Sequence, residues 1–86
     1  MNQATEIYSR EFDSIFYKLS AAVRARIIAD IRDLGRRLES FPHRRLQGRP
    51  EFRLRIGDYR VIYLFDVQRN ELLLSTLGHR RDVYRF

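Results

Sequence analysis

Residues 52–65 carry the pattern that most restricts the fold: two apolar, strand-like runs separated by a Gly-Asp pair. In the first run, residues 52–56 (FRLRI), apolar and arginine side chains alternate with a period of two, as in a strand with one buried face. Gly57 and Asp58 are typical of a two-residue hairpin turn, in which Gly adopts a positive φ. Residues 59–65 (YRVIYLF) are apolar at most positions, so we expect a central strand paired antiparallel with the first.

A two-residue turn also determines which residues pair across this hairpin. If Ile56 pairs with Tyr59, the apolar partners of both strands share one face. On the other face Arg55 then lies directly opposite Arg60, with Arg53 diagonal to it. Like charges in these positions destabilise a sheet. Three guanidinium groups on one face therefore predict a site for an oxyanion such as phosphate, which Arg binds bidentately.

Two structural explanations of the arginine cluster stay open. Arg53 and Arg55 are also what an edge strand carries when it is charged against aggregation. Arg60 could instead form an ion pair with Asp58 or Glu51.

The first half of the chain is helical by its apolar periodicity. Residues 4–8 are expected to form a short strand. A helix over residues 10–19 follows, capped by Ser9, and a second helix over residues 21–39 is capped by Ser20. We expect the two helices to form an antiparallel hairpin.

The second half of the chain is stranded. Residues 40–50 (SFPHRRLQGRP) are expected to form a basic loop, because two prolines and a glycine exclude a helix or an inner strand. Residues 66–70 predict a second turn, and residues 71–77 another inner strand that Gly78 ends. The order predicts one α+β domain over residues 1–86: an N-terminal strand, a two-helix hairpin, then a three- to four-stranded, mostly antiparallel sheet.

The charge of the chain favours an anionic partner. Of its 17 basic residues only Lys18 is not Arg, and the formal net charge is +6. Nucleic acid is the first candidate for such a partner, although a GC-rich coding sequence produces the same excess of Arg. The chain has no Cys, which excludes disulfides and Cys-ligated metal. An isolated loop histidine such as His43 is expected at the surface, and we expect no metal and no cofactor.

We also expect a cytoplasmic protein that does not enter a membrane. No apolar run approaches the roughly 20 residues of a membrane span. The first ten residues lack the basic and apolar pattern of a signal peptide.

Residues 52–63 (FRLRIGDYRVIY), followed by residues 78–84 (GHRRDVY), closely resemble the RelE branch of the RelE/ParE superfamily of toxins. The resemblance covers nearly the whole chain, since the element order and the length also fit. It implies a RelE-like microbial RNase fold, with two helices on one face of a sheet and a concave basic site on the other. It also implies a type II toxin that cuts mRNA in the ribosomal A site. A cognate antitoxin, encoded in the adjacent reading frame, would neutralise it.

The resemblance implies a catalytic set as well. The family positions fall on Arg53, Arg55, Arg60, Arg80 and Tyr84. The implied reaction is metal-independent attack of a ribose 2′-OH on the adjacent phosphate. Arg55 and Arg60 would stabilise the phosphorane and Arg53 would hold the phosphate. Arg80 would stabilise or protonate the leaving oxygen, and Tyr84 would stack on or orient the base.

One step of this reaction has no assigned residue. Arg53 and Arg55 are lysines in the best-studied RelE proteins, and an Arg does not readily accept a proton. His79 is the nearby side chain that can exchange a proton near neutral pH. Strand alternation points His79 away from Arg80, so a surface or partner-contacting role is the alternative. Further candidates for RNA contact are Arg44, Arg45, Arg49 and Arg81.

Two other functions remain open at this point. A ParE-like toxin would bind DNA gyrase without cutting RNA, although such toxins generally lack the full Arg and Tyr set. A plain RNA-binding or partner-binding module is the third possibility. In the toxin interpretation, the protein would meet DNA only through its antitoxin.

Overall fold

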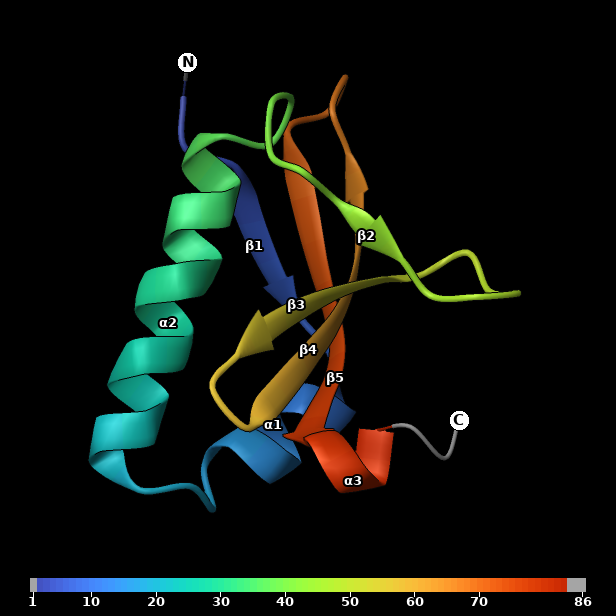
Figure 1. The fold of residues 1–86 in the computed structure, drawn as a ribbon. Helices are drawn as coiled ribbons and strands as arrows, with labels where there is room; N and C mark the ends of the chain where they lie inside the picture. Colours follow the sequence, from blue (N-terminus) through green and yellow to red (C-terminus); the bar gives the residue numbers. More distant parts are fainter. Residues whose placement is uncertain (1, 84–86) are drawn as a thin grey trace.

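A single five-stranded sheet with two helices on one side makes up the body of the molecule, in a computed structural model that describes residues 2–83. The elements follow in the order β1 (Thr5–Tyr8), α1 (Arg10–Phe16), α2 (Ala21–Arg36), β2 (Arg44–Arg45), β3 (Phe52–Ile56), β4 (Tyr59–Asp66), β5 (Glu71–His79) and α3 (Arg80–Val83). The α+β class and the strand, two-helix, sheet order predicted from the sequence are confirmed (Figure 1).

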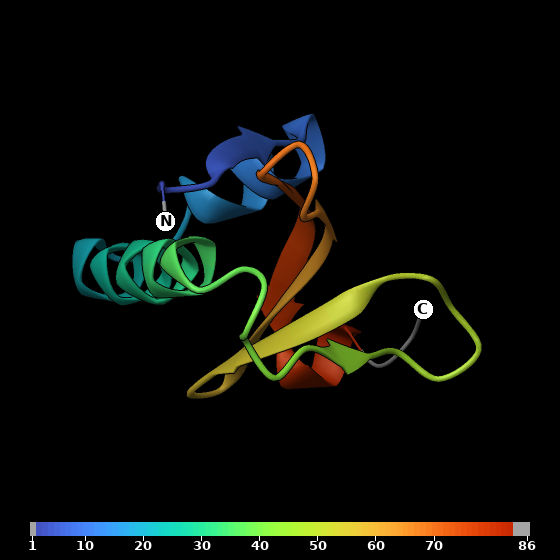
Figure 2. The ribbon, with the colours of Figure 1, turned by 90° about the horizontal axis from the view of Figure 1, so that it is seen from above.

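The strands are arranged in the order β1-β5-β4-β3-β2. The pairs from β2 to β5 are antiparallel, whereas β1 lies parallel to β5. Seen from above, α1 and α2 lie on one side of the sheet and the loop of residues 46–51 extends from the other (Figure 2). The side of the sheet away from α1 and α2 therefore carries this loop, and Ile62 and Thr76 are buried there.

Helix α1 begins where its sequence predicts and ends three residues earlier. The Ser9 hydroxyl accepts the N–H of Phe12 at 3.0 Å and so caps the helix. After Phe16 the chain tightens into a turn, in which the Leu19 N–H donates to the Phe16 carbonyl. The turn is required because Ser20, the cap of α2, takes an extended backbone that cannot continue a helix.

Helix α2 also ends three residues before its predicted end. Its apolar stripe continues into Leu38, which is almost fully buried although it lies in a turn. The helix ends at Arg36 because the next residue, Arg37, has a non-helical backbone whose N–H donates to the Leu34 carbonyl. Apolar periodicity indicates which residues are buried, and here the buried residues continue beyond the end of the helix.

The core lies between the helices and the sheet. It is built by apolar side chains of α1, α2 and the inner strands, the largest fully buried ones being Tyr63, Phe12, Ile27, Ile31, Leu34, Leu38, Leu72, Leu74, Leu77 and Val61. Phe52 and Leu54 of β3 pack against this cluster. The apolar face of the hairpin therefore points toward the helices, as its alternation predicts.

Strand β5 is longer than predicted and contains an irregularity. Gly78 does not end the strand: it pairs with Arg60, and His79 pairs with Tyr59. Between Ile62 and Tyr63 of β4 the register shifts, so that Ser75 is the extra residue of a β-bulge.

The bulge is tied to the cap of α1. The Ser9 hydroxyl donates to the Ser75 carbonyl, and the Ser9 N–H donates to the Leu74 carbonyl at 3.1 Å. One serine thus satisfies both an orphan N–H of the helix and a carbonyl of the bulge.

Residues 40–50 are not wholly a loop. Arg44 and Arg45 form the short strand β2, which pairs antiparallel with β3 at the edge of the sheet. A two-residue strand shows no alternation, so its pattern could not predict it. Within residues 2–83, none of the helices has the length and apolar run that a transmembrane span requires.

Candidate anion-binding site

The β3–β4 hairpin has the register that its turn predicts. Ile56 pairs with Tyr59, and Arg55 lies directly opposite Arg60. Gly57 takes a φ of 59°, the left-handed conformation that the two-residue turn needs. Because side chains alternate along a strand, Arg53, Arg55 and Arg60 share the face away from the helices.

Strand β2 brings a fourth arginine to this face. Arg44 pairs with Arg53, and Arg45 pairs with Phe52 on the opposite face. The Arg45 guanidinium lies over the Phe52 ring, 5.2 Å from its centroid. Of the candidate RNA-binding arginines before β3, therefore, Arg44 joins the site and Arg45 does not.

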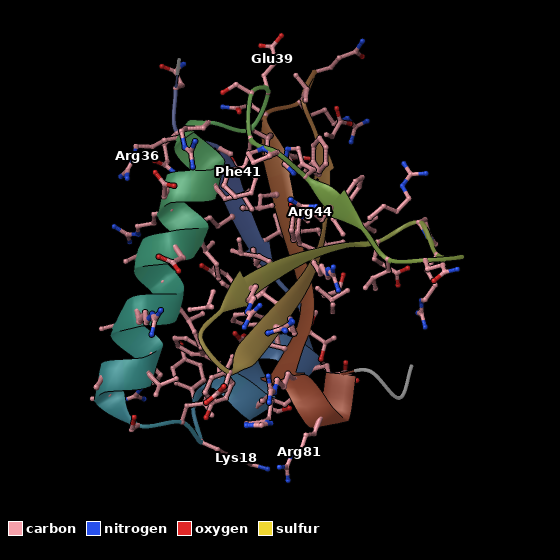
Figure 3. All side chains as sticks on the ribbon, in the orientation of Figure 1. Lys18, Arg36, Glu39, Phe41, Arg44 and Arg81 are labelled. Atoms are coloured by element: carbon pink, nitrogen blue, oxygen red, sulfur yellow. The ribbon has the colours of Figure 1, made fainter. Side chains whose placement is uncertain are left out.

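We call Arg44, Arg53, Arg55 and Arg60 the arginine face. Together with Phe41, Pro42 and Leu54 they line a hollow of about 360 Å³. Figure 3 shows Arg44 over the sheet and Phe41 between α2 and β2. The hollow therefore has a cationic lining and an apolar wall, which suits a phosphate attached to a larger organic group.

Arg60 is the most enclosed member of the arginine face. Only 5% of its surface is exposed, whereas Arg55 is exposed and Arg53 is half-buried. The Arg60 Nη1 donates to the carbonyl of Tyr59 at 3.2 Å. On the neighbouring strand Gly78 places no side chain opposite Arg60. Burial limits the rotamers of Arg60, which presents its guanidinium with less loss of entropy on binding.

Glu51, one of the two carboxylates considered as a partner of Arg60, pairs with Arg49. Glu51 accepts two hydrogen bonds from Arg49, at 3.0 Å and 3.3 Å. These hydrogen bonds hold the pKa of the Glu51 carboxyl below its usual range. Within residues 2–83, no ion pair joins Arg44, Arg53 or Arg55 to a carboxylate. The bidentate pairing with Glu51 offsets the charge of Arg49, which lies outside the hollow.

The C-terminal residues of the predicted site begin a helix. The Arg80 N–H donates to the Asp58 carbonyl at 2.7 Å, so the start of α3 lies against the hairpin turn. The side chains of Arg80 and Arg81 are exposed, and Arg81 points away from the sheet (Figure 3). Tyr84 lies outside the described residues.

His79 is placed on the face of the sheet that packs against the helices. It pairs with Tyr59, its ring lies edge-on to the Tyr59 ring, and its Nδ1 accepts the Arg81 N–H at 3.4 Å. Strand alternation indeed separates His79 from the arginine face. Strand alternation does not determine the direction of Arg80, because the strand ends at His79 and a helix follows.

His43 is not the surface residue that its sequence context predicts. Its ring is half-buried, and both of its nitrogens have hydrogen-bond partners. The expectation rested on its position in a loop, and it was wrong because that loop folds back over the aromatic side chains of β3 and β4. Among residues 2–83, no group of three or more His, Asp or Glu side chains could hold a metal ion.

Residues 2–84 match the family model of the ParE toxin of the type II toxin–antitoxin system parDE. The chain belongs to this family. The membership confirms the RelE/ParE resemblance of residues 52–63 and makes the chain a toxin of a type II toxin–antitoxin system. No curated protein sequence matches the chain.

Solved structures of RelE toxins share the fold of this ParE-family chain. In the RelBE2 toxin–antitoxin complex from Mycobacterium tuberculosis the matched chain is 23% identical, with a TM-score of 0.75 over 93% of this chain and 94% of that one. The isolated Escherichia coli RelE toxin is 14% identical, with a TM-score of 0.74 over 95% and 97%. In the archaeal RelE–RelB complex from Pyrococcus horikoshii the matched chain is 23% identical, with a TM-score of 0.71 over 92% of this chain and 97% of that one.

Proposed function

We propose that this toxin is a ribosome-dependent mRNA endonuclease whose arginine face binds the scissile phosphate. The observation that carries the proposal is the position of Arg55 directly opposite Arg60, beside a second pair of facing arginines, Arg44 and Arg53. Such pairing costs stability. A bound phosphate would supply the negative charge that offsets this cost.

In the proposed reaction a ribose 2′-oxygen attacks the adjacent phosphorus and loses its proton. The bond from phosphorus to the 5′-oxygen of the next nucleotide breaks, and that oxygen takes up a proton. The products are a 2′,3′-cyclic phosphate and a 5′-hydroxyl. Arg55 and Arg60 stabilise the additional negative charge of the phosphorane, and Arg53 holds the phosphate.

The remaining roles belong to the ends of the site. Arg80 lies at the start of α3, close to the hairpin turn, and stabilises or protonates the leaving oxygen. Tyr84 stacks on the base. We assign much of the rate enhancement to in-line positioning of the mRNA on the ribosome and to the fixed charges. A general base at His79 would have to act from the face opposite the arginine face.

The proposed partners follow from the same function. A cognate antitoxin of the type found in the RelBE complexes would neutralise the toxin, and mRNA on the ribosome would be its substrate. The toxin would act in the cytoplasm and meet DNA only through the antitoxin.

The match to the ParE model supports a second candidate, a toxin that binds DNA gyrase without cutting RNA. Mapping of mRNA ends after induction without antitoxin separates the two. We expect new 5′-hydroxyl ends at codon-spaced positions on translated mRNAs, lost in Arg60→Ala. A DNA-damage response with intact mRNA would favour the gyrase-binding function instead. Circular dichroism of Arg60→Ala must show a folded protein for the comparison to hold.

A further inference from the structure

His43 joins the segment after α2 to the middle of the sheet. Its Nε2 lies 2.7 Å from the carbonyl oxygen of Leu38, and its Nδ1 lies 2.7 Å from the hydroxyl of Tyr63. Leu38 is in the turn that follows α2, and Tyr63 is a fully buried residue of β4. One imidazole therefore connects the turn after α2, five residues before it, with β4, 20 residues after it.

These partners determine the tautomer of the neutral ring. A carbonyl oxygen only accepts hydrogen bonds, so the Nε2 of His43 must carry a proton and donate it to Leu38. The Nδ1 then has a free lone pair and accepts from the Tyr63 hydroxyl. Within residues 2–83, His43 is the hydrogen-bond partner recorded for that hydroxyl. The Tyr63 O–H and the His43 ring thus satisfy each other in an apolar environment.

The ring is also held by aromatic packing. It stacks on Phe65 with centroids 3.8 Å apart and an interplanar angle of 16°. Phe41 and Phe52 contact it at tilted angles, with centroids 5.4 Å and 5.6 Å away. These three ring contacts and the two hydrogen bonds together hold the ring in one orientation.

The neighbours of His43 in the chain belong to the hollow. Phe41 and Pro42 come directly before it and Arg44 directly after it, and all three line the cavity, whereas His43 does not. The strand that carries Arg44 has only two residues and lies at the edge of the sheet. So short a strand has few ladder hydrogen bonds of its own to hold it.

We propose that His43 is a positioning residue that holds Arg44 and the Phe41–Pro42 wall against the other three residues of the arginine face, and so sets the affinity of that face for RNA. This inference rests on the proposed function. His43 itself touches neither substrate nor reacting atoms.

The test compares variants that separate the polar contacts of His43 from its packing. His43→Phe keeps an aromatic ring among Phe41, Phe52 and Phe65 but removes both hydrogen bonds. His43→Gln keeps an amide that can donate to the Leu38 carbonyl, and it serves as the conservative rescue. Ile27→Val removes a methyl group from the core of α2 and is the control for a general loss of stability.

Three measurements on the full chain are decisive. The ring ¹⁵N shifts of wild-type His43 should report the Nε2–H tautomer. Amide hydrogen exchange at residues 44–46 should accelerate in His43→Phe and remain slow in Ile27→Val. In cleavage of mRNA on programmed ribosomes, His43→Phe should raise KM about tenfold, the loss expected of one charge-assisted contact to phosphate. Its kcat should change much less, and His43→Gln should recover part of the KM.

The outcomes distinguish this inference from the proposed function. Unchanged exchange at residues 44–46 in His43→Phe, or a ring that populates both tautomers, overturns the inference even if the wild type cuts mRNA. Faster exchange with an unchanged KM overturns it as well. If the wild type cuts no mRNA, the proposed function fails and the affinity role fails with it. The exchange and tautomer data then still decide whether His43 holds the wall.

Discussion

Arg55 and Arg60 face each other across the β3–β4 hairpin as directly paired residues, one exposed and the other almost fully buried. Two positive charges in this relationship repel, and the fold would be more stable with an acidic or neutral residue at one of the two positions. A substitution at this pair should therefore change stability and function in opposite directions, and the two effects can be measured separately.

Substitution Arg55→Glu should stabilise the protein and abolish growth arrest. An opposite-charge pair with Arg60 replaces a like-charge pair, which we expect to add about 0.2 to 1 kcal/mol to the free energy of unfolding. The anion site loses one cation and gains a carboxylate that repels phosphate. Urea denaturation and induction in cells without antitoxin measure the two effects. Lys18→Glu, an equal change of charge at an exposed position outside the site, should leave toxicity intact. A toxic Arg55→Glu protein would contradict the proposal.

The salt dependence of RNA binding should report the number of phosphate contacts. For single strands, the slope of log K against log salt is about −0.7 for each phosphate contact. If Arg53 holds one phosphate, Arg53→Gln should reduce the magnitude of the slope by about 0.7. Fluorescence anisotropy with a short oligonucleotide that contains 2′-deoxyribose measures this. Arg36→Gln, on the exposed side of α2 where Arg36 pairs with Asp33, should leave the slope unchanged.

Ser9→Ala should destabilise the fold more than Ser20→Ala, although both serines cap a helix. Loss of a cap alone costs about 1 kcal/mol. Ser9 also donates to the bulge carbonyl of Ser75, and leaving this group unsatisfied adds about 1 kcal/mol. The difference between the two variants in urea denaturation should therefore be about 1 kcal/mol. Equal losses would mean that the bulge carbonyl finds another donor.

Gly57→Ala should cost more stability than Gly48→Ala. Both glycines have a positive φ, 59° and 72°, and an alanine there costs about 1 kcal/mol. A Cβ at Gly57 would in addition lie 3.2 Å from the Arg26 guanidinium, whereas a Cβ at Gly48 meets nothing within 4 Å. The loss at Gly48 thus measures the backbone alone.

The Arg49–Glu51 pair should make part of the stability depend on pH at the acid end. The folded state lowers the pKa of the Glu51 carboxyl, mainly through the hydrogen bonds from Arg49. Its contribution is therefore present above the unfolded value of about 4.3 and is lost as the pH falls through the folded value. Denaturation at a series of pH values should show a flatter acid slope in Glu51→Gln. Glu39→Gln, which removes an exposed carboxylate, should keep the wild-type slope. Identical slopes in all three proteins would contradict this assignment.

The sequence predicts the hairpin well because turn chemistry and alternation act over only a few residues. Gly57 and Asp58 determine the register, and the register places Arg55 opposite Arg60 without any knowledge of the remaining fold. The class and the element order follow from periodicities of the same kind. Where α1 and α2 end is less predictable, since Leu19 and Leu38 continue the apolar pattern into turns.

The parts that the sequence does not predict depend on contacts between distant segments. Arg44 reaches the arginine face because residues 40–50 fold back along β3, and two residues of strand leave no periodic signal. His43 lies in the same segment, and its partners are five and 20 residues away. Gly78 continues β5 because it pairs with Arg60 of β4, and a glycine with such a partner does not end its strand.

The parallel pairing of β1 with β5 has a consequence for how the protein is made. Thr5 pairs with Glu71 and Tyr8 with Leu74, so the first strand synthesised has its partner in the last. Contacts between residues so far apart in sequence form late, and a fold that depends on them forms slowly. The sheet that supports the hairpin cannot be completed while β5 is still inside the ribosome. A cell can therefore supply the antitoxin throughout the synthesis of the toxin, and for part of the time that the toxin takes to fold, before the toxin is complete.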